Sequence, residues 1–157
     1  MSYEDIWKRE QQAHKAERKK PRHTESNLQQ DCVRWFRLQY PKLALLLFAV
    51  PNGGKRTRRT FVDKYGRVVS YSPEAQAMNR EGVTAGVSDL ILLKPSGPFA
   101  SLCIEMKTTE KGSKQRECQK IWQKAAEAAG NKYVICRTLE QFMDEVKSYL
   151  AGTPPQP

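Results

Sequence analysis

Two apolar runs joined by a short turn constrain the fold more than any other part of the sequence. The runs cover about residues 87–93 and 101–107, and the segment between them contains two prolines and a glycine. So short a connection predicts that the two runs pair as an antiparallel β-hairpin. If the turn centres on Gly97, residues whose numbers sum to 194 lie opposite one another, and Asp89 then faces Glu105.

A carboxylate pair on one face of this hairpin needs a cation nearby. Directly opposed residues have Cβ atoms about 4.5–5.5 Å apart, and like charges at that distance destabilise a sheet. Lys107 is two residues beyond Glu105 and shares its face, but one ammonium leaves Asp89 and Glu105 with a net negative charge. Carboxylate oxygens and water are the ligands that Mg²⁺ and Mn²⁺ prefer. A structural ion pair without metal stays open as an alternative, and a register shifted by one residue would move Asp89 to the other face.

The chain is strongly basic, with a net charge of +10 over 157 residues and a pI of about 9.6. Excess positive charge favours polyanionic partners, above all nucleic acid, although a basic surface without a specific partner explains charge alone equally well. No apolar run approaches the roughly 20 residues of a membrane span, and there is no signal segment, so we expect a cytoplasmic protein without membrane contact. The four cysteines lack the spacing of a zinc site and are expected to be buried free thiols.

The whole pattern predicts a mixed α/β fold. Thr24 is the expected N-cap of a first helix, and residues 43–50 form a continuously apolar run of the kind found in strands covered on both faces. Apolar periodicity and Gly or Pro breaks define the other elements. The expected order is helix, strand, hairpin with a short helix, strand, strand, helix, strand and helix, over residues 25–39, 43–50, 55–71 with 73–80, 87–93, 101–107, 113–129, 132–137 and 139–150.

We expect one domain with a flanking segment at each end. Residues 1–22 are highly charged and are predicted to form an arm, residues 23–150 contain all the predicted elements, and residues 151–157 form a disordered tail. A basic hairpin insertion occupies about residues 57–71. From residue 55 to residue 71, a single acid, Asp63, is accompanied by six cations: Lys55, Arg56, Arg58, Arg59, Lys64 and Arg67.

Four short motifs follow one another in a distinctive order. They are PNGGKR at residues 51–56, AGVSDL at 85–90, IEMK at 104–107 and, in a predicted helix, QKIWQKAAEAAG at 119–130. In this order they resemble the VRR-NUC family of the PD-(D/E)XK nuclease superfamily, whose members have PNGG followed by a basic residue, AGVPDL, ELK and a helix with a glutamine. The resemblance covers about residues 24–150 and implies a restriction-endonuclease-like core.

The resemblance also assigns roles to individual residues. Asp89 and Glu105 match the family's metal-binding acids, and the main-chain carbonyl of Met106 matches a further ligand. Lys107 matches the catalytic lysine.

Two more residues match functional positions of the family, but each match has an alternative. Glu25 matches an acid of the first helix that reaches the metal directly or through water, although an acid favoured by the helix dipole would look the same. Gln119 matches the helix glutamine, with Gln115 as the second candidate. Ser88 departs from the family's proline, which loosens the loop but leaves the ligands in place. The residues expected to bind nucleic acid are Asn52, Gly53, Lys55, Arg56, Arg58 and Arg59.

The function implied by the resemblance is that of a DNA endonuclease using Mg²⁺, which Mn²⁺ could replace, with no small-molecule cofactor. Small stand-alone members look like phage or bacterial enzymes, some of them homodimers acting on branched DNA such as four-way junctions. We therefore expect a homodimer in a bacterial or phage-infected cell. A non-catalytic nucleic-acid-binding module on the same fold and a basic structural or RNA-associated protein are the alternatives, and the retained acids and lysine argue against both. The basic hairpin is expected to add a grip on DNA, or else to be an ordinary surface insertion.

Overall fold

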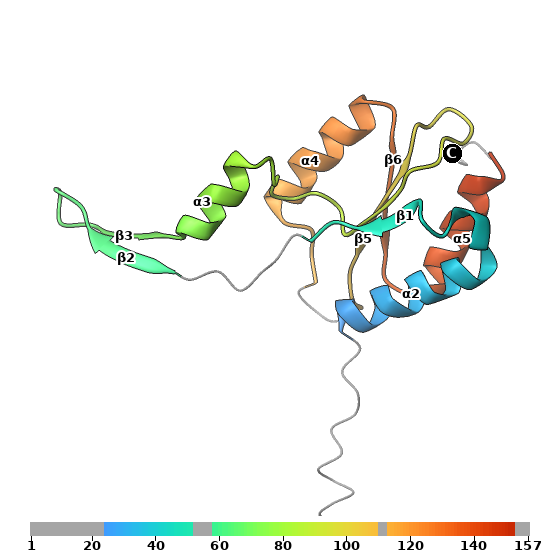
Figure 1. Cartoon of the computed structure of the whole chain (residues 1–157), viewed down its shortest axis with the longest axis horizontal. Helices are drawn as coiled ribbons and strands as arrows, with labels where there is room; N and C mark the ends of the chain where they lie inside the picture. The colour runs from blue at the N-terminus through green and yellow to red at the C-terminus, as the bar shows by residue number, and fades with distance from the viewer. Residues whose placement is uncertain (1–23, 52–57, 110–112, 153–157) are drawn as a thin grey trace, which may run out of the picture.

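A four-stranded mixed sheet forms the centre of the fold (Figure 1). The computed structural model describes residues 24–51, 58–109 and 113–152, so the expected arm and most of the expected tail lie outside the described residues. The strands lie in the order β1-β4-β5-β6, with neighbours antiparallel except for the parallel pair β5 and β6. Their bounds are Leu47–Ala49 for β1, Leu90–Leu92 for β4, Leu102–Met106 for β5 and Lys132–Cys136 for β6.

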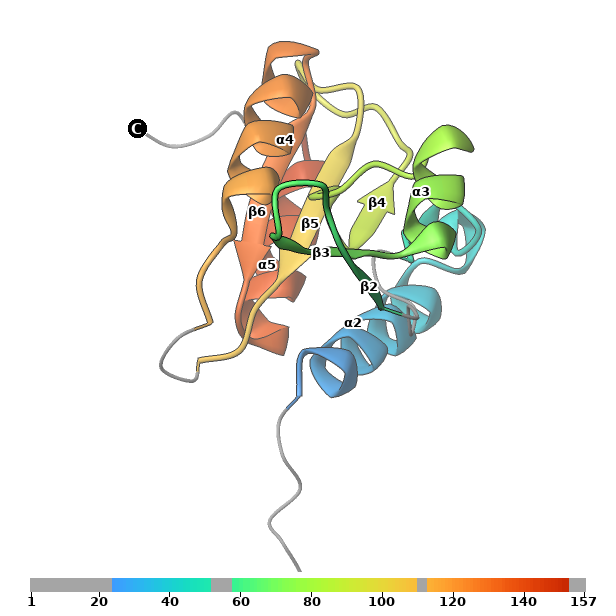
Figure 2. The same ribbon diagram turned by 90° about the vertical axis from the view of Figure 1, so that its left-hand side faces the viewer.

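Helices cover both faces of this sheet. The helix α4 (Glu117–Ala128) connects β5 to β6, as a parallel pair requires, and packs on one face. The helices α2 (Glu25–Gln39) and α5 (Leu139–Leu150) pack together on the other face (Figure 2). The mixed α/β fold and the order of its elements are as predicted, and the Thr24 side chain accepts the capping hydrogen bond from the Asn27 N–H at 3.1 Å.

Alternation along β5 separates the apolar core from the polar site. Leu102, Ile104 and Met106 point into the core beneath α2 and α5, with Phe36 and Phe142 among its largest buried side chains. Glu105 and Cys103 point to the opposite face, where α4 lies. Every residue of β5 is buried, because the strand has a neighbour on each side and a helix layer on each face.

The register predicted for the β4–β5 hairpin is confirmed, but its turn is built differently. Leu90 pairs with Ile104 and Leu92 with Leu102, so paired numbers sum to 194. The loop is centred between Gly97 and Pro98, because Ser96 and Phe99 exchange two backbone hydrogen bonds of 3.0 Å. One extra residue on the β4 side compensates for this half-residue shift, as in a β-bulge.

Two other expectations were wrong in extent. The apolar run 43–50 is not one doubly covered strand: the 3₁₀ helix η1 (Pro41–Leu43) and a turn precede β1, which lies at the sheet edge, and Leu45 is 94% exposed. The helix predicted from residue 113 begins only at Glu117, because the preceding residues are extended. In both cases tertiary packing overrides the local apolar pattern.

Part of the segment between β1 and β4 projects from the rest of the fold. It contains the strands β2 (Arg59–Val62) and β3 (Val68–Tyr71), which pair as a hairpin, and the helix α3 (Pro73–Arg80). Figure 1 shows this hairpin and α3 to one side of the central sheet, and in Figure 2, turned by 90°, the hairpin lies in front of the sheet. Within the described ranges, no helix is long and apolar enough to cross a membrane.

Gly86 fixes the loop that enters β4. Its φ of +88° is one that residues with side chains rarely adopt, and a Cβ added there would lie 2.3 Å from the Cys118 carbonyl oxygen. The same Cβ would lie 2.8 Å from the Gln119 nitrogen. The loop backbone therefore rests directly on the first turns of α4, and glycine is the residue that allows this contact.

We predict that Gly86→Ala destabilises the protein more than Gly82→Ala does. Gly82 also has a positive φ, +97°, but its added Cβ would meet no atom within 4 Å. Gly82→Ala should therefore cost only the backbone strain, about 1–2 kcal/mol, whereas Gly86→Ala adds the clash with α4. Urea unfolding of the two variants measures the difference, and equal losses would contradict the close packing of this loop on α4.

Candidate active site

Glu105 is the centre of a buried polar cluster on the α4 side of β5. Its carboxylate is fully buried and accepts hydrogen bonds on both oxygens. Lys107 Nζ donates to Oε1 at 2.7 Å, and Gln119 Nε2 donates to the same oxygen. The Tyr133 hydroxyl donates to Oε2 at 3.4 Å. Three donors from β5, α4 and β6 thus compensate the carboxylate for the water it loses.

Gln119 is held in one orientation by the start of α4. Its Oε1 accepts a hydrogen bond of 2.8 Å from the Arg116 N–H, which leaves its amide N–H groups directed at Glu105. Gln115, the other candidate for this role, donates to Gln123 at 2.8 Å and to the Tyr133 hydroxyl at 3.3 Å. Of the two glutamines, only Gln119 donates a hydrogen bond to the Glu105 carboxylate among the described contacts, and this bond is to Glu105 rather than to Lys107.

Asp89 lies one residue before β4, at the open end of the β4–β5 pairing. Its Oδ2 accepts a hydrogen bond from the Met106 N–H at 2.8 Å. The N–H and C=O of one strand residue point to the same side, so the Met106 carbonyl also faces the β4 edge where Asp89 lies. Asp89 is tied to β1 as well, because its own carbonyl accepts from the Val50 N–H at 2.9 Å.

Glu25 approaches the cluster from the first turn of α2. Its Oε1 is 3.8 Å from Lys107 Nζ and accepts a hydrogen bond of 3.1 Å from the Ser113 hydroxyl. Ser113 in turn accepts from the Thr108 N–H at 3.1 Å, which links the chain after β5 to α2. The Lys107 ammonium therefore lies between the carboxylates of Glu25 and Glu105.

Burial dominates the electrostatics of the two central acids. It raises the pKa of Asp89, against the lowering effects of the Met106 N–H and of Lys107. Burial also raises the pKa of Glu105, which the Lys107 hydrogen bond lowers and the charge of Asp89 raises further. Two neighbouring carboxylates that are costly to ionise form a site where added positive charge is favourable.

The donor set of this site fits Mg²⁺ by its chemistry. Asp89, Glu105 and the Met106 carbonyl offer only oxygen, the ligand that Mg²⁺ prefers. Within the described part of the chain, no three His, Cys, Asp or Glu side chains are grouped to hold an ion by themselves. Mg²⁺ is commonly bound by one or two carboxylates together with water and substrate phosphate. Glu25 is engaged instead with Ser113 and Lys107.

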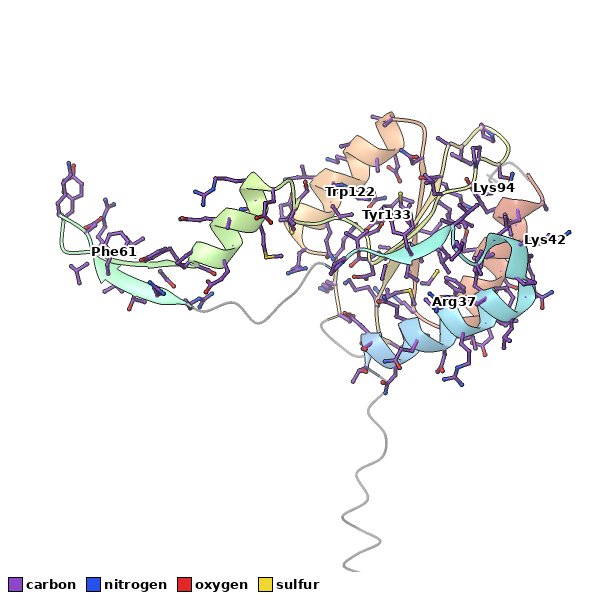
Figure 3. All side chains as sticks on the ribbon, viewed as in Figure 1. Arg37, Lys42, Phe61, Lys94, Trp122 and Tyr133 are labelled. Carbon is purple, nitrogen blue, oxygen red and sulfur yellow. The ribbon has the colours of Figure 1, made fainter. Side chains whose placement is uncertain are left out.

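A groove of about 710 Å³ leads away from the acids along α2. Glu25 and Asp89 line one part of it, and Arg34 and Arg37 line another. Figure 3 shows Arg37 on α2. The sequence interpretation missed these arginines. The spacing of four along Glu25, Gln29, Val33 and Arg37 places each residue next to the one before it on the helix surface, and all four line the groove.

The residues expected to bind nucleic acid are only partly within the described structure. Asn52, Gly53, Lys55 and Arg56 lie outside the described residues, whereas Arg58 and Arg59 are exposed at the start of β2. Tyr133 was not anticipated at all. A tyrosine in an apolar strand is normally interpreted as a core residue. Only the pairing of β5 with β6 brings Tyr133 to Glu105.

Comparison with known proteins supports the fold independently. No family profile matches the chain, and no curated protein sequence matches it. A solved structure described as a VRR_NUC domain protein matches with a TM-score of 0.62 and 22% sequence identity, over 83% of this chain and 90% of that one. This chain has the VRR-NUC fold. The fold resemblance inferred from the short motifs is thereby confirmed in three dimensions.

The raised pKa of Asp89 predicts how stability depends on pH. Asp89→Asn keeps an oxygen to accept the Met106 N–H bond and removes the charge. Because burial raises the pKa of Asp89 in the folded protein, the ionised carboxylate lowers stability at neutral pH. In EDTA, we expect the variant to unfold at higher urea than the wild type at neutral pH. The gain should shrink as pH falls through the folded-state pKa and vanish below the unfolded value of about 3.9. A variant less stable than the wild type at neutral pH would contradict the sign.

Proposed function

We propose that the chain is a metal-dependent nuclease that hydrolyses phosphodiester bonds in DNA. The observation that carries the proposal is the Lys107 ammonium 2.7 Å from the buried Glu105 carboxylate, with Asp89 at the adjoining end of β4. Buried charged residues make the protein less stable than apolar residues at the same positions would. A chemical role therefore explains this cluster better than a structural one. The VRR-NUC fold supports the same class of activity.

Each residue of the cluster has a role in this proposal. Asp89, Glu105 and the Met106 carbonyl would hold Mg²⁺, with Glu25 contributing directly or through water. Mg²⁺ held there would supply Lewis acidity and charge neutralisation at the scissile phosphate, and Mn²⁺ could replace it. Lys107 would position or deprotonate the attacking water, whose oxygen bonds to phosphorus as a P–O bond to one sugar oxygen breaks. Gln119 holds the Glu105 carboxylate in place.

The groove along α2 offers a path for the DNA backbone. Arg37 lines the same groove twelve residues beyond Glu25, which is about 18 Å along the helix axis. At a rise of about 3.4 Å per nucleotide, this distance corresponds to roughly five nucleotides. Arg34 and Arg37 would contact phosphates there, together with Arg58 and Arg59 and the basic residues that precede them. Such contacts position DNA by charge and do not read its sequence.

A second candidate function is a nucleic-acid-binding module without catalysis. The arginines of the groove would suit it equally well. The carboxylates of Glu25 and Asp89 line the same groove and would repel DNA phosphates. A protein that only binds DNA would have no use for them. The nuclease is therefore the better explanation.

We also propose a preference for branched DNA, such as four-way junctions, cut by a homodimer in a bacterial or phage-infected cell. Two copies would present two active sites to the two strands that must be cut. The support for this finer proposal is the resemblance of the sequence motifs to small stand-alone VRR-NUC enzymes.

We predict that cleavage requires both metal and the charge of Glu105. Purified protein is incubated with linear, flapped and four-way-junction DNA in Mg²⁺, Mn²⁺ or EDTA, beside Glu105→Gln. The variant keeps the size of the side chain but loses the negative charge, so cleavage should fall by about 100-fold or more, while DNA binding persists.

Glu117→Gln is the matched control, because Glu117 is an exposed glutamate on the same side of the sheet as the site, in the first turn of α4. It should cut as the wild type does. Cleavage by Glu105→Gln equal to wild type, or cleavage unaffected by EDTA, would contradict the assignment of the site. DNA binding without cleavage under any metal would favour the binding module.

We predict a dimer in solution at micromolar concentration. Sedimentation velocity measures the mass of the protein at the concentrations used for cleavage of four-way junctions. A single monomeric species that cuts junctions with full activity would show that two copies are not needed.

A further inference from the structure

The β2–β3 hairpin exposes apolar side chains that the other described residues do not cover. The cross-strand pair Val62 and Val68 lies on one face next to the turn, with exposed fractions of 65% and 73%. Phe61, on the other face, is 50% exposed and packs edge-on with the Tyr71 ring at a centroid distance of 5.7 Å. Figure 3 shows Phe61 in this projection, beside the part of the chain that holds the central sheet. An isolated two-stranded hairpin with such residues in water is only marginally stable, so a partner surface is expected.

The turn that carries this apolar end is tightly built. Asp63 Oδ1 accepts hydrogen bonds from the Tyr65 N–H at 2.8 Å and from the Arg67 N–H at 2.9 Å, and Asp63 Oδ2 pairs with Arg67 Nε at 3.1 Å. These bonds lower the pKa of Asp63, so the carboxylate stays charged and keeps the turn closed. Gly66 has a φ of +76°, as this tight turn requires. The turn therefore presents Val62 and Val68 in a defined shape.

Cations surround the apolar end. The Tyr65 ring has Lys64 Nζ 5.0 Å and the Arg67 guanidinium 5.1 Å from its centroid, and the ring is 68% exposed. Arg58 and Arg59 are exposed at the other end of β2. The same cations at the hairpin end of a second copy would repel these, so like charge disfavours this end as the interface of the proposed homodimer. Charge complementarity favours a polyanionic partner that also exposes apolar surface. Nucleic acid with accessible bases has both properties.

We propose that the end of this hairpin is an apolar wedge that packs against DNA bases where their stacking is interrupted, as at unpaired or branched positions. The inference rests on the proposed function in taking DNA as the substrate, and it adds the part of the protein that recognises the branch. Lys64, Arg67 and Tyr65 contact the flanking phosphates and sugars, while Val62 and Val68 replace a lost stacking partner. Apolar side chains placed between base steps, with cations on the adjacent backbone, are a known mode of DNA distortion and recognition.

The test compares the full-length wild type with the double variant Val62→Thr, Val68→Thr. Threonine keeps the branched shape and strand preference of valine but places a hydroxyl on the apolar end. Affinity is measured in EDTA for linear duplex and for four-way-junction DNA with 2-aminopurine at the branch point, whose fluorescence reports unstacking. We expect the variant to lose about fivefold or more in affinity for the junction, to lose the fluorescence change, and to bind linear duplex nearly as the wild type does.

Leu45→Thr is the matched control, because Leu45 is an apolar residue with 94% exposure outside the hairpin. It should change neither affinity nor fluorescence. Lys64→Gln should weaken binding to both DNA forms and lower the salt dependence, as loss of a phosphate contact does.

Three results would overturn the wedge. They are unchanged junction affinity and fluorescence in the double variant, equal loss for duplex and junction, and a change in oligomeric state without an effect on DNA, which would make a second copy the occupant. Each of these leaves metal-dependent cleavage by the wild type intact. Failure of the nuclease proposal appears separately, as absence of cleavage by the wild type in Mg²⁺ or Mn²⁺.

Discussion

The buried hydrogen bond between Glu105 and Lys107 is the interaction on which the rest of the structure depends. A carboxylate without exposure to water is tolerated only where donors replace the water it loses. Those donors come from three elements, so the strand β5, the helix α4 and the strand β6 must each hold a fixed position. The doubly covered centre of the sheet provides this rigidity, since Ile104 and Met106 lock the opposite face of β5 into the apolar core.

The arrangement of charge in the molecule has two zones. Acids lie at the buried centre, where low polarity strengthens their interaction with a cation. Exposed arginines and lysines lie farther out, on α2 and on the hairpin between β1 and β4. Long-range attraction to a polyanion is therefore separated from the short-range repulsion that the carboxylates alone would cause. In the proposed nuclease, this separation would allow one small domain to attract DNA and still keep carboxylate ligands at the metal site.

Local signals predicted those features that depend on neighbours in sequence. The 87–107 hairpin, its register, the Thr24 cap and the short helix after Ser72 follow from turn residues, alternation and capping, and the structure has them. The register was right although the turn is centred half a residue away, because an extra residue on the β4 side restores the pairing. The register from which we expected Asp89 to face Glu105 needed no information beyond that hairpin.

Features that depend on distant segments could not be predicted in the same way. The contact of Tyr133 with Glu105 arises from the parallel pairing of β5 with β6, which no local pattern encodes. The role of Arg37 in the groove depends on how α2 lies against the sheet. The run 43–50 looked like a central strand because its composition does not reveal that β1 lies at an edge. Gln119 was preferred to Gln115 because of the family resemblance. The physical reason for the preference is the hydrogen bond from the Arg116 N–H, which orients Gln119 at the start of α4.

The hydrogen bond from the Val50 N–H to the Asp89 carbonyl closes a loop in the chain, because β1 and β4 are neighbours in the sheet although about forty residues separate them. The β2–β3 hairpin and α3, which lie between these two points in sequence, are not part of the four-stranded sheet. The entropy of closing such a loop changes only slowly with its length. The segment can therefore be lengthened, shortened or exchanged in evolution, or by protein engineering, with little effect on strand pairing. The chemistry at the sheet and the choice of nucleic acid could thus diverge as independent modules.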